Sequence, residues 1–328
     1  MDTQQHALNH QIVRVLGGSH LYGTNTTRSD KDFVAVAMPH PTHILGMESF
    51  ETCDIRTNSS ASGHRNNAAD VDVTIHSLPK FITLASGCNP NIVEMLFVPD
   101  NCKVITTGWW EQVLQVREAF IHKGAYHRFS GYAFSQRKKL EAKRQTWVLR
   151  EELREKMEKL GLGLEEALVK ARQGAQKLPG TTTEDLRWGS YLPIINDLLR
   201  CGESWRSELY SEHGYDTKFA SHMIRLLHEG IELLTEGTIR LPLTHVREVL
   251  AIKEGQWSYE HVMDHADHLK QLADLAYVKS DLPKKPNLRV LEQLQMSLLV
   301  DYWKENNLWT SESSALLSTG NLSGPSPK

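Results

Sequence analysis

The chain has 328 residues, which is long enough for one large domain or two ordinary ones. Its formal net charge of -3 excludes a globally basic nucleic-acid-binding protein, so any attraction for phosphate must come from a local patch. The four widely spaced cysteines include no Cys-x-x-Cys pair, so their spacing does not indicate a zinc site. A reducing compartment is the simpler assumption for such cysteines. A polar N-terminus and the lack of an apolar run near the roughly 18 residues of a membrane span predict a cytoplasmic protein with no membrane partner.

The first third of the chain, to about Gly124, predicts a small sheet with helices packed on it. Short apolar runs bounded by turn residues indicate strands at residues 12–16, 33–38 and 71–75. A helical pattern follows at residues 78–85, and Ser77 is a suitable N-cap before Pro79 in the first turn.

From Ala125 onward strand signals nearly vanish, and helical apolar spacing with mixed charges runs through residues 137–173 and 218–235. In residues 137–173 charge is abundant and apolar residues are sparse. This segment therefore predicts a solvated helical hairpin, interrupted near Gly161 and Gly163, that forms an exposed arm and not a core element.

These patterns predict three parts. Residues 1–124 form a catalytic domain, and residues 125–310 form a helical domain with a charged insertion around residues 138–187. Residues 311–328, rich in Ser, Gly and Pro, form a disordered tail, and the polar segment at residues 57–67 forms a mobile loop.

A glycine-serine turn follows the first predicted strand. Gly18 has no side chain, so a nucleotide phosphate can approach the backbone closely. Backbone N–H groups and the hydroxyl of Ser19 would then bind the phosphate oxygens. Gly18 and Ser19 are thus the candidate phosphate-binding residues.

Carboxylates stand at the start of the next two strands. In Asp30-x-Asp32 the alternation of a strand projects both side chains to one face. Asp70 and Asp72 precede the following strand, and we choose Asp72 as the third ligand and as the group whose charge activates the attacking hydroxyl. Hard cations such as Mg2+, or Mn2+ in its place, prefer such oxygen ligands and bridge them to nucleotide phosphates.

Gly18-Ser19 followed by Asp30-x-Asp32 resembles the signature of the DNA polymerase beta nucleotidyltransferase superfamily. Within it the chain is similar to a bacterial and phage group of predicted nucleotidyltransferases that includes RNA-ligase-associated proteins. The similarity covers most of residues 12–285, through blocks that read Ser77-Leu78-Pro79-Lys80-Phe81, Asn89-Pro90-Asn91, Glu94-Met95-Leu96-Phe97, Tyr215 to Leu227, Glu232 to Gly237 and Ile252 to Trp257.

The resemblance implies an α+β architecture, with a polymerase-beta-type nucleotidyltransferase domain of small mixed sheet and helices followed by a mainly α-helical domain. It also implies that Asp30, Asp32 and Asp72 are the catalytic and metal-binding residues. Two departures are visible: Lys253 stands where the group has arginine, and residues 138–187 have no counterpart, which leaves the substrate open.

A basic helix face is a further candidate site. Lys218, His222 and Arg225 are spaced i, i+4 and i+7, so they share one face. They form either a clamp for the triphosphate or the acceptor backbone, or an ordinary solvated face.

We therefore predict an enzyme that moves a nucleoside monophosphate from a nucleoside triphosphate, such as ATP, to a hydroxyl acceptor with Mg2+. The resemblance favours RNA processing, with tRNA or RNA ends as acceptor. Two alternatives stay open: nucleotidylation of a protein side chain, and a non-catalytic, antitoxin-like module that binds nucleotide or RNA. The presence of three mutually repelling carboxylates argues against the module.

Overall fold

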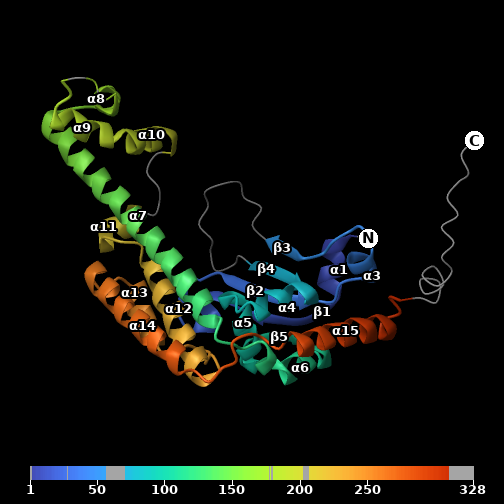
Figure 1. Cartoon of the computed structure of the whole chain (residues 1–328). Helices are drawn as coiled ribbons and strands as arrows, with labels where there is room; N and C mark the ends of the chain where they lie inside the picture. The colour runs from blue at the N-terminus through green and yellow to red at the C-terminus, as the bar shows by residue number, and fades with distance from the viewer. Residues whose placement is uncertain are drawn as a thin grey trace, which may run out of the picture. The chain divides into compact units, whose positions relative to one another are not determined.

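The structure is a computed structural model that describes residues 2–27, 29–56, 71–176, 178, 180–201 and 207–309 (Figure 1). The predicted loop at residues 57–67, Asp70 and the predicted tail at residues 311–328 lie outside the described residues. The chain divides into two compact units. The first unit comprises Met1–Phe129, His228–Val246 and Leu272–Lys328, and the second comprises Ser130–Leu227 and Arg247–Gln271.

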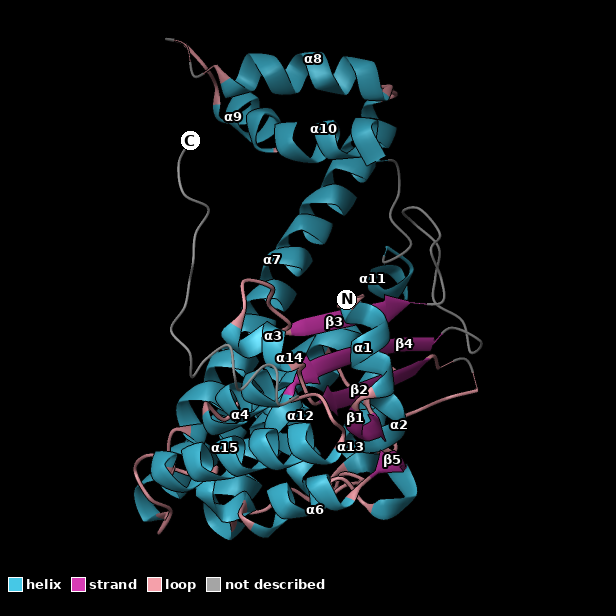
Figure 2. Cartoon of the chain, turned by 90° about the vertical axis from the view of Figure 1, so that its right-hand side faces the viewer, coloured by secondary structure: helices cyan, strands magenta, loops and turns pink. Residues whose placement is uncertain are grey.

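A five-stranded mixed sheet lies in the first unit, in the order β3-β4-β2-β1-β5 (Figure 2). Its strands are β1 (Gln11–Leu16), β2 (Lys31–Ala37), β3 (Thr52–Arg56), β4 (Val71–Ser77) and β5 (Lys103–Thr106). Strands β2 and β4 are parallel, and the other neighbours are antiparallel. The three predicted strands are confirmed as β1, β2 and β4, while β3 and β5 are additional.

One face of the sheet packs against α1 (Thr3–Asn9). Alternate residues of β2 and β4 point to this face, as the period of a strand requires. The small side chains on β2 leave room for the helix. The buried residues of this cluster are Ala7, Ala35, Ala37, Phe50, Val73 and Ile75.

The first unit also contains a longer helix, α15 (Leu288–Glu305). Its short helices are α2 (Gly18–Tyr22), α3 (Pro41–Leu45), α4 (Leu78–Ser86), α5 (Pro90–Val93), η1 (Glu94–Phe97), η2 (Asp100–Cys102), α6 (Gly108–Gln115) and η3 (Arg117–Ala119). The helix predicted at residues 78–85 is confirmed as α4, and the Ser77 side chain accepts a hydrogen bond from the backbone N–H of Lys80. Phe81 of α4 meets Trp110 of α6 edge to face, with ring centroids 5.2 Å apart.

The later part of the chain is helical, as predicted (Figure 1). Its helices are α7 (Ala125–Leu160), α8 (Leu164–Ala175), α9 (Thr183–Ser190), α10 (Leu192–Cys201), α11 (Ser207–His213), α12 (Thr217–Glu236), α13 (Val246–Lys253) and α14 (Tyr259–Lys279). The predicted interruption is confirmed: α7 ends before Gly161, whose φ of 61° is left-handed. Within the described residues, no helix is both long enough and apolar enough to span a membrane.

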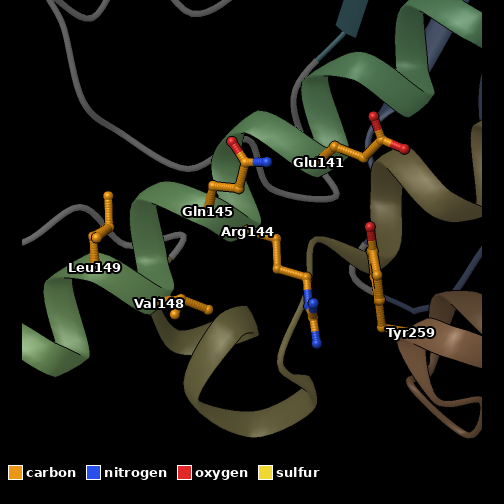
Figure 3. A pocket seen from close by; sticks show the side chains of 6 residues that line it. All are labelled: Glu141, Arg144, Gln145, Val148, Leu149 and Tyr259. Atoms are coloured by element: carbon orange, nitrogen blue, oxygen red, sulfur yellow. The ribbon is translucent and has the colours of Figure 1, made fainter.

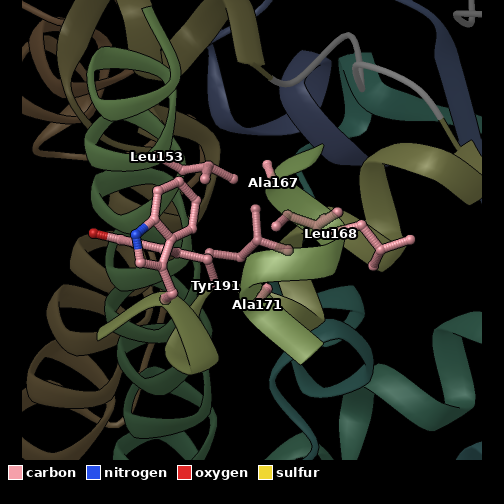
Figure 4. Close-up of a cluster of buried hydrophobic side chains, with 8 residues drawn as sticks. Leu153, Ala167, Leu168, Ala171 and Tyr191 are labelled. Atoms are coloured by element: carbon pink, nitrogen blue, oxygen red, sulfur yellow. The ribbon is translucent and has the colours of Figure 1, made fainter. Parts of the chain in front are cut away.

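The prediction that the charged segment at residues 137–173 forms no core element is wrong, because this segment contributes buried side chains to a hydrophobic cluster. Helices α7 to α10 share a hydrophobic cluster (Figure 4) made of Leu153, Ala167, Leu168, Ala171, Trp188, Tyr191, Ile194 and Ile195. A Cβ atom on Gly174 of α8 would collide with the backbone of Asp185 in α9, so glycine lets the two helices approach closely. The apolar side chains come mostly from α8, α9 and α10, whereas α7 itself shows almost no apolar face in its sequence.

Candidate active site

The sheet brings the predicted aspartates of two strands to one edge. Because β2 and β4 are parallel, their first residues lie at the same end, and Asp32 is the register partner of Asp72. Residues that face each other across neighbouring strands point to the same side of a sheet. The two carboxylates therefore share one face, and both residues are half-buried.

The glycine-serine turn lies at this same edge. Strand β1 runs antiparallel to β2, so its last residue, Leu16, pairs with Phe33 near the start of β2. The backbone N–H of Gly17 donates a hydrogen bond to the carbonyl of Asp32 at 2.8 Å. This hydrogen bond holds the turn into α2 beside Asp32.

Gly18 is required both by its backbone and by its neighbour. Its φ of 57° is left-handed, and a Cβ atom there would overlap the Asp32 carboxylate. The carboxylate consequently lies against the Gly18 backbone, next to half-buried Ser19. Asp30, one residue before β2, is also half-buried.

Strand β3 adds two polar residues that the sequence analysis missed. Arg56 is the register partner of Asp72, and Asp54 is the partner of Thr74, so they lie on the aspartate face. The Thr74 hydroxyl donates to Asp54 Oδ1 at 2.7 Å. The signal was present as alternation of polar and apolar residues from Thr52 to Arg56, which is typical of a half-buried strand.

Comparison with known proteins identifies the family of the chain. Residues 2–287 match the family described as the RNA repair pathway DNA polymerase beta family. The protein belongs to this family. The predicted resemblance to the DNA polymerase beta superfamily is therefore confirmed, together with its sheet-containing domain and helical region.

One curated relative is the "Uncharacterized 38.9 kDa protein in nrdC-mobD intergenic region" of Enterobacteria phage T4. It is 35% identical over 88 residues, which are 27% of this chain and 26% of the relative. The match thus spans about a quarter of the relative's length, and it agrees with the predicted phage connection of the family.

A hydrogen bond to a buried carboxylate holds α2 of this family member in position. Tyr22, the last residue of α2, donates its hydroxyl to Glu94, at 2.9 Å from Oε1 and 3.1 Å from Oε2. Glu94 lies in η1 and is only 5% exposed. Since Gly18 and Ser19 begin α2, this hydrogen bond fixes the far end of the helix that carries the candidate phosphate-binding residues.

The predicted basic face lies on α12, in the second unit. Lys218 is exposed, whereas Arg225 is only 5% exposed, so this face is not simply solvated. Burial lowers the pKa of His222 to about 3, together with the positive charges of Arg225, Lys218 and Lys139. His222 is therefore neutral near pH 7, so the positive charge of this face comes from exposed Lys218 and buried Arg225. Their role as a clamp stays a prediction.

Proposed function

We propose that this protein is a Mg2+-dependent nucleotidyltransferase that transfers a nucleoside monophosphate from a nucleoside triphosphate to a hydroxyl group of RNA. The observation that carries the proposal is the parallel pairing of β2 and β4, which aligns Asp32 with Asp72 beside the Gly18-Ser19 turn. The family description, which names an RNA repair pathway, supports RNA as the acceptor.

The donor set fits a hard divalent cation. Asp30, Asp32 and Asp72 offer only carboxylate oxygens, which Mg2+ and Mn2+ prefer, and no sulfur ligand competes among them. These three residues would hold the metal. When bound, it would stabilise negative charge on the reacting phosphate and on the entering and leaving oxygens.

The remaining residues would bind and orient the nucleotide. The backbone of Gly18 and the hydroxyl of Ser19 would donate hydrogen bonds to phosphate oxygens. Asp72 would accept the proton of the attacking hydroxyl as a general base, which makes the hydroxyl oxygen more nucleophilic. Arg56, the register partner of Asp72 on β3, would pair with the departing pyrophosphate through its planar guanidinium.

The test is a labelling reaction with each α-labelled nucleoside triphosphate, Mg2+, cellular RNA and cellular protein. Label that nuclease removes and protease does not would support transfer to RNA. Asp32→Asn should abolish the label, because it removes a metal ligand of the proposed site. Asp100→Asn is the matched control, since this exposed carboxylate pairs with Lys103 and is not among the proposed metal ligands, so it should leave transfer unchanged.

Two other outcomes would replace the proposal. Label removed by protease would identify a protein side chain as the acceptor. Equal labelling by the wild type and Asp32→Asn would mean that these aspartates do not perform the chemistry. Binding of RNA without any Asp32-dependent label would favour a non-catalytic module.

A further inference from the structure

The second unit contains a pocket of about 610 Å3 between α7 and the start of α14 (Figure 3). This volume lies within the range of small-molecule binding sites, about 300–1,000 Å3. The pocket is lined by Glu141, Arg144, Gln145, Val148, Leu149 and Tyr259. The lining thus combines apolar surface, an aromatic ring, a guanidinium and hydrogen-bonding groups.

Arg144 and Tyr259 form a flat wall of this pocket. The Arg144 guanidinium carbon lies 3.9 Å from the centroid of the Tyr259 ring, and the two side chains face each other in Figure 3. Arg144 also pairs with Glu260 at 3.1 Å. Its Nε atom is buried and has no hydrogen-bond partner among the described residues, so one donor of the wall is unused.

The charges in the pocket favour an uncharged ring over a phosphate. Glu260 pairs with Arg144, and Arg137 Nε donates to Glu141 Oε1 at 2.9 Å, so both charged groups of the lining are already paired. The Glu141 carboxylate still has acceptor capacity for an exocyclic amino group, which adenine, cytosine and guanine carry. RNA bases are commonly bound in this way, stacked on an aromatic or guanidinium plane and hydrogen-bonded at their edges.

The pocket continues along α7 as a stripe of four exposed residues and the half-buried Glu141. The residues of this stripe recur at helical spacing and so share one face of the helix. They are Phe134, Lys138, Glu141, Gln145 and Val148. Phe134 is 56% exposed, and the ammonium of Lys138 lies 4.7 Å from the centroid of its ring. Phe134 and Glu141 are about 10 Å apart along the axis at a rise of about 1.5 Å per residue. An aromatic ring and a cation thus stand a short distance from the pocket, in the pattern of single-strand binding surfaces.

We propose that this stripe of α7 binds single-stranded RNA, with one base in the pocket against Arg144 and Tyr259, a second base on Phe134, and a backbone phosphate at Lys138. The inference rests on the proposed function only in taking RNA as the acceptor. The pocket would then select the strand by an unpaired base, since a base inside a duplex cannot enter it.

The test measures the binding of a short fluorescein-labelled single-stranded RNA by fluorescence anisotropy, in the absence of nucleotide and metal. Val148→Trp fills the pocket mouth and should raise the dissociation constant roughly ten-fold. Val169→Trp is the matched control, because Val169 is also an exposed valine, 55% exposed, on a helix of the same unit but outside the pocket. It should bind like the wild type.

A second variant protects the test against misfolding of the first. Phe134→Ala removes an exposed ring and should weaken binding several-fold, as the loss of one stacked base predicts. Unchanged affinity in both Val148→Trp and Phe134→Ala would overturn the proposal. Equal affinity of the wild type for a duplex of the same sequence would also overturn it.

The proposed function can fail separately. Asp32→Asn tests the transfer chemistry and Val148→Trp tests the RNA-binding stripe, because Asp32 is not part of the stripe. Binding that depends on Val148 without any nucleotide transfer would keep this inference and reject the enzyme. If the wild type transfers nucleotide to RNA and Val148→Trp binds RNA as tightly as the wild type, the proposed activity would stand and the RNA-binding role of the pocket would be wrong.

Discussion

At the scale of single residues, Gly18 has the most demanding environment in the candidate site. Gly18→Ala would strain a left-handed backbone and push the new Cβ into the Asp32 carboxylate. We expect a loss of about 1–3 kcal/mol in the free energy of unfolding, measured in urea. Transfer should fall roughly a hundred-fold, because the carboxylate must move from its place.

Gly108→Ala provides the control for that substitution. No atom of the described residues lies within 4 Å of a Cβ at Gly108, and Gly108 begins helix α6. This variant should be as stable as the wild type or slightly more stable. If Gly18→Ala behaved in the same way, the steric explanation for this glycine would be wrong.

Tyr22 also makes a residue-scale prediction. Tyr22→Phe deletes the hydroxyl that donates to buried Glu94, and should cost about 1–3 kcal/mol of the free energy of unfolding. Tyr277→Phe removes a hydroxyl for which the described residues provide no hydrogen bond, so it should cost much less. Equal stability of the two variants would mean that the Tyr22 contact does not hold α2 in place.

At the scale of elements, the sequence predicts well those segments whose own residues carry the pattern. The apolar runs of β1, β2 and β4 and the capped start of α4 are local features. Strand β5 has only four residues, and alternate residues of β3 are exposed, so neither produces a strong apolar run. The pairing of Asp32 with Asp72 depends on strand order, which no local pattern contains.

The cluster shared by α7 to α10 makes an element-scale prediction. Leu153 is 1% exposed, and Leu153→Ala should cost about 2–5 kcal/mol of local stability by leaving a cavity. Hydrogen exchange of α8 to α10 should then speed up, while the sheet stays protected. Leu160→Ala changes a half-exposed position on the same helix, and it should change neither the local stability nor the hydrogen exchange of α8 to α10. Similar exchange rates in the two variants would contradict the role of this cluster.

His222 predicts a dependence of stability on pH. Its pKa falls from 6.5 to about 3 on folding, so the unfolded state binds the extra proton between these values. Stability should therefore decrease as pH falls from 6.5 towards 3, and His222→Gln should lose less stability than the wild type. Urea midpoints at pH 7 and pH 5 would measure the difference. His268→Gln, at an exposed position, should follow the wild type, and an equal loss in His222→Gln would contradict the assignment.

At the scale of the whole molecule, the two units are assembled from distant segments of the chain. Tyr302 and Trp303 of α15 illustrate this within the first unit. The Tyr302 hydroxyl lies 2.9 Å from Nδ1 of His10, and Trp303 Nε1 donates to the carbonyl of Pro39 at 2.7 Å. Apolar periodicity and capping residues are local patterns, so they do not indicate contacts between residues nearly three hundred positions apart. Such packing therefore could not be predicted from the sequence.

The net charge of -3 limits how the whole molecule can attract RNA. Affinity should depend on a few local cations, so the logarithm of the binding constant should fall only shallowly with the logarithm of the salt concentration. If exposed Lys218 contacts a backbone phosphate, Lys218→Ala should reduce that slope by about 0.7, the value for one contact to a single strand. Lys159→Ala removes an exposed lysine at the end of α7 and should leave the slope unchanged. Parallel lines for the wild type and Lys218→Ala would assign Lys218 to an ordinary solvated helix face, because a lysine that displaces no counterion from the RNA cannot be touching a phosphate.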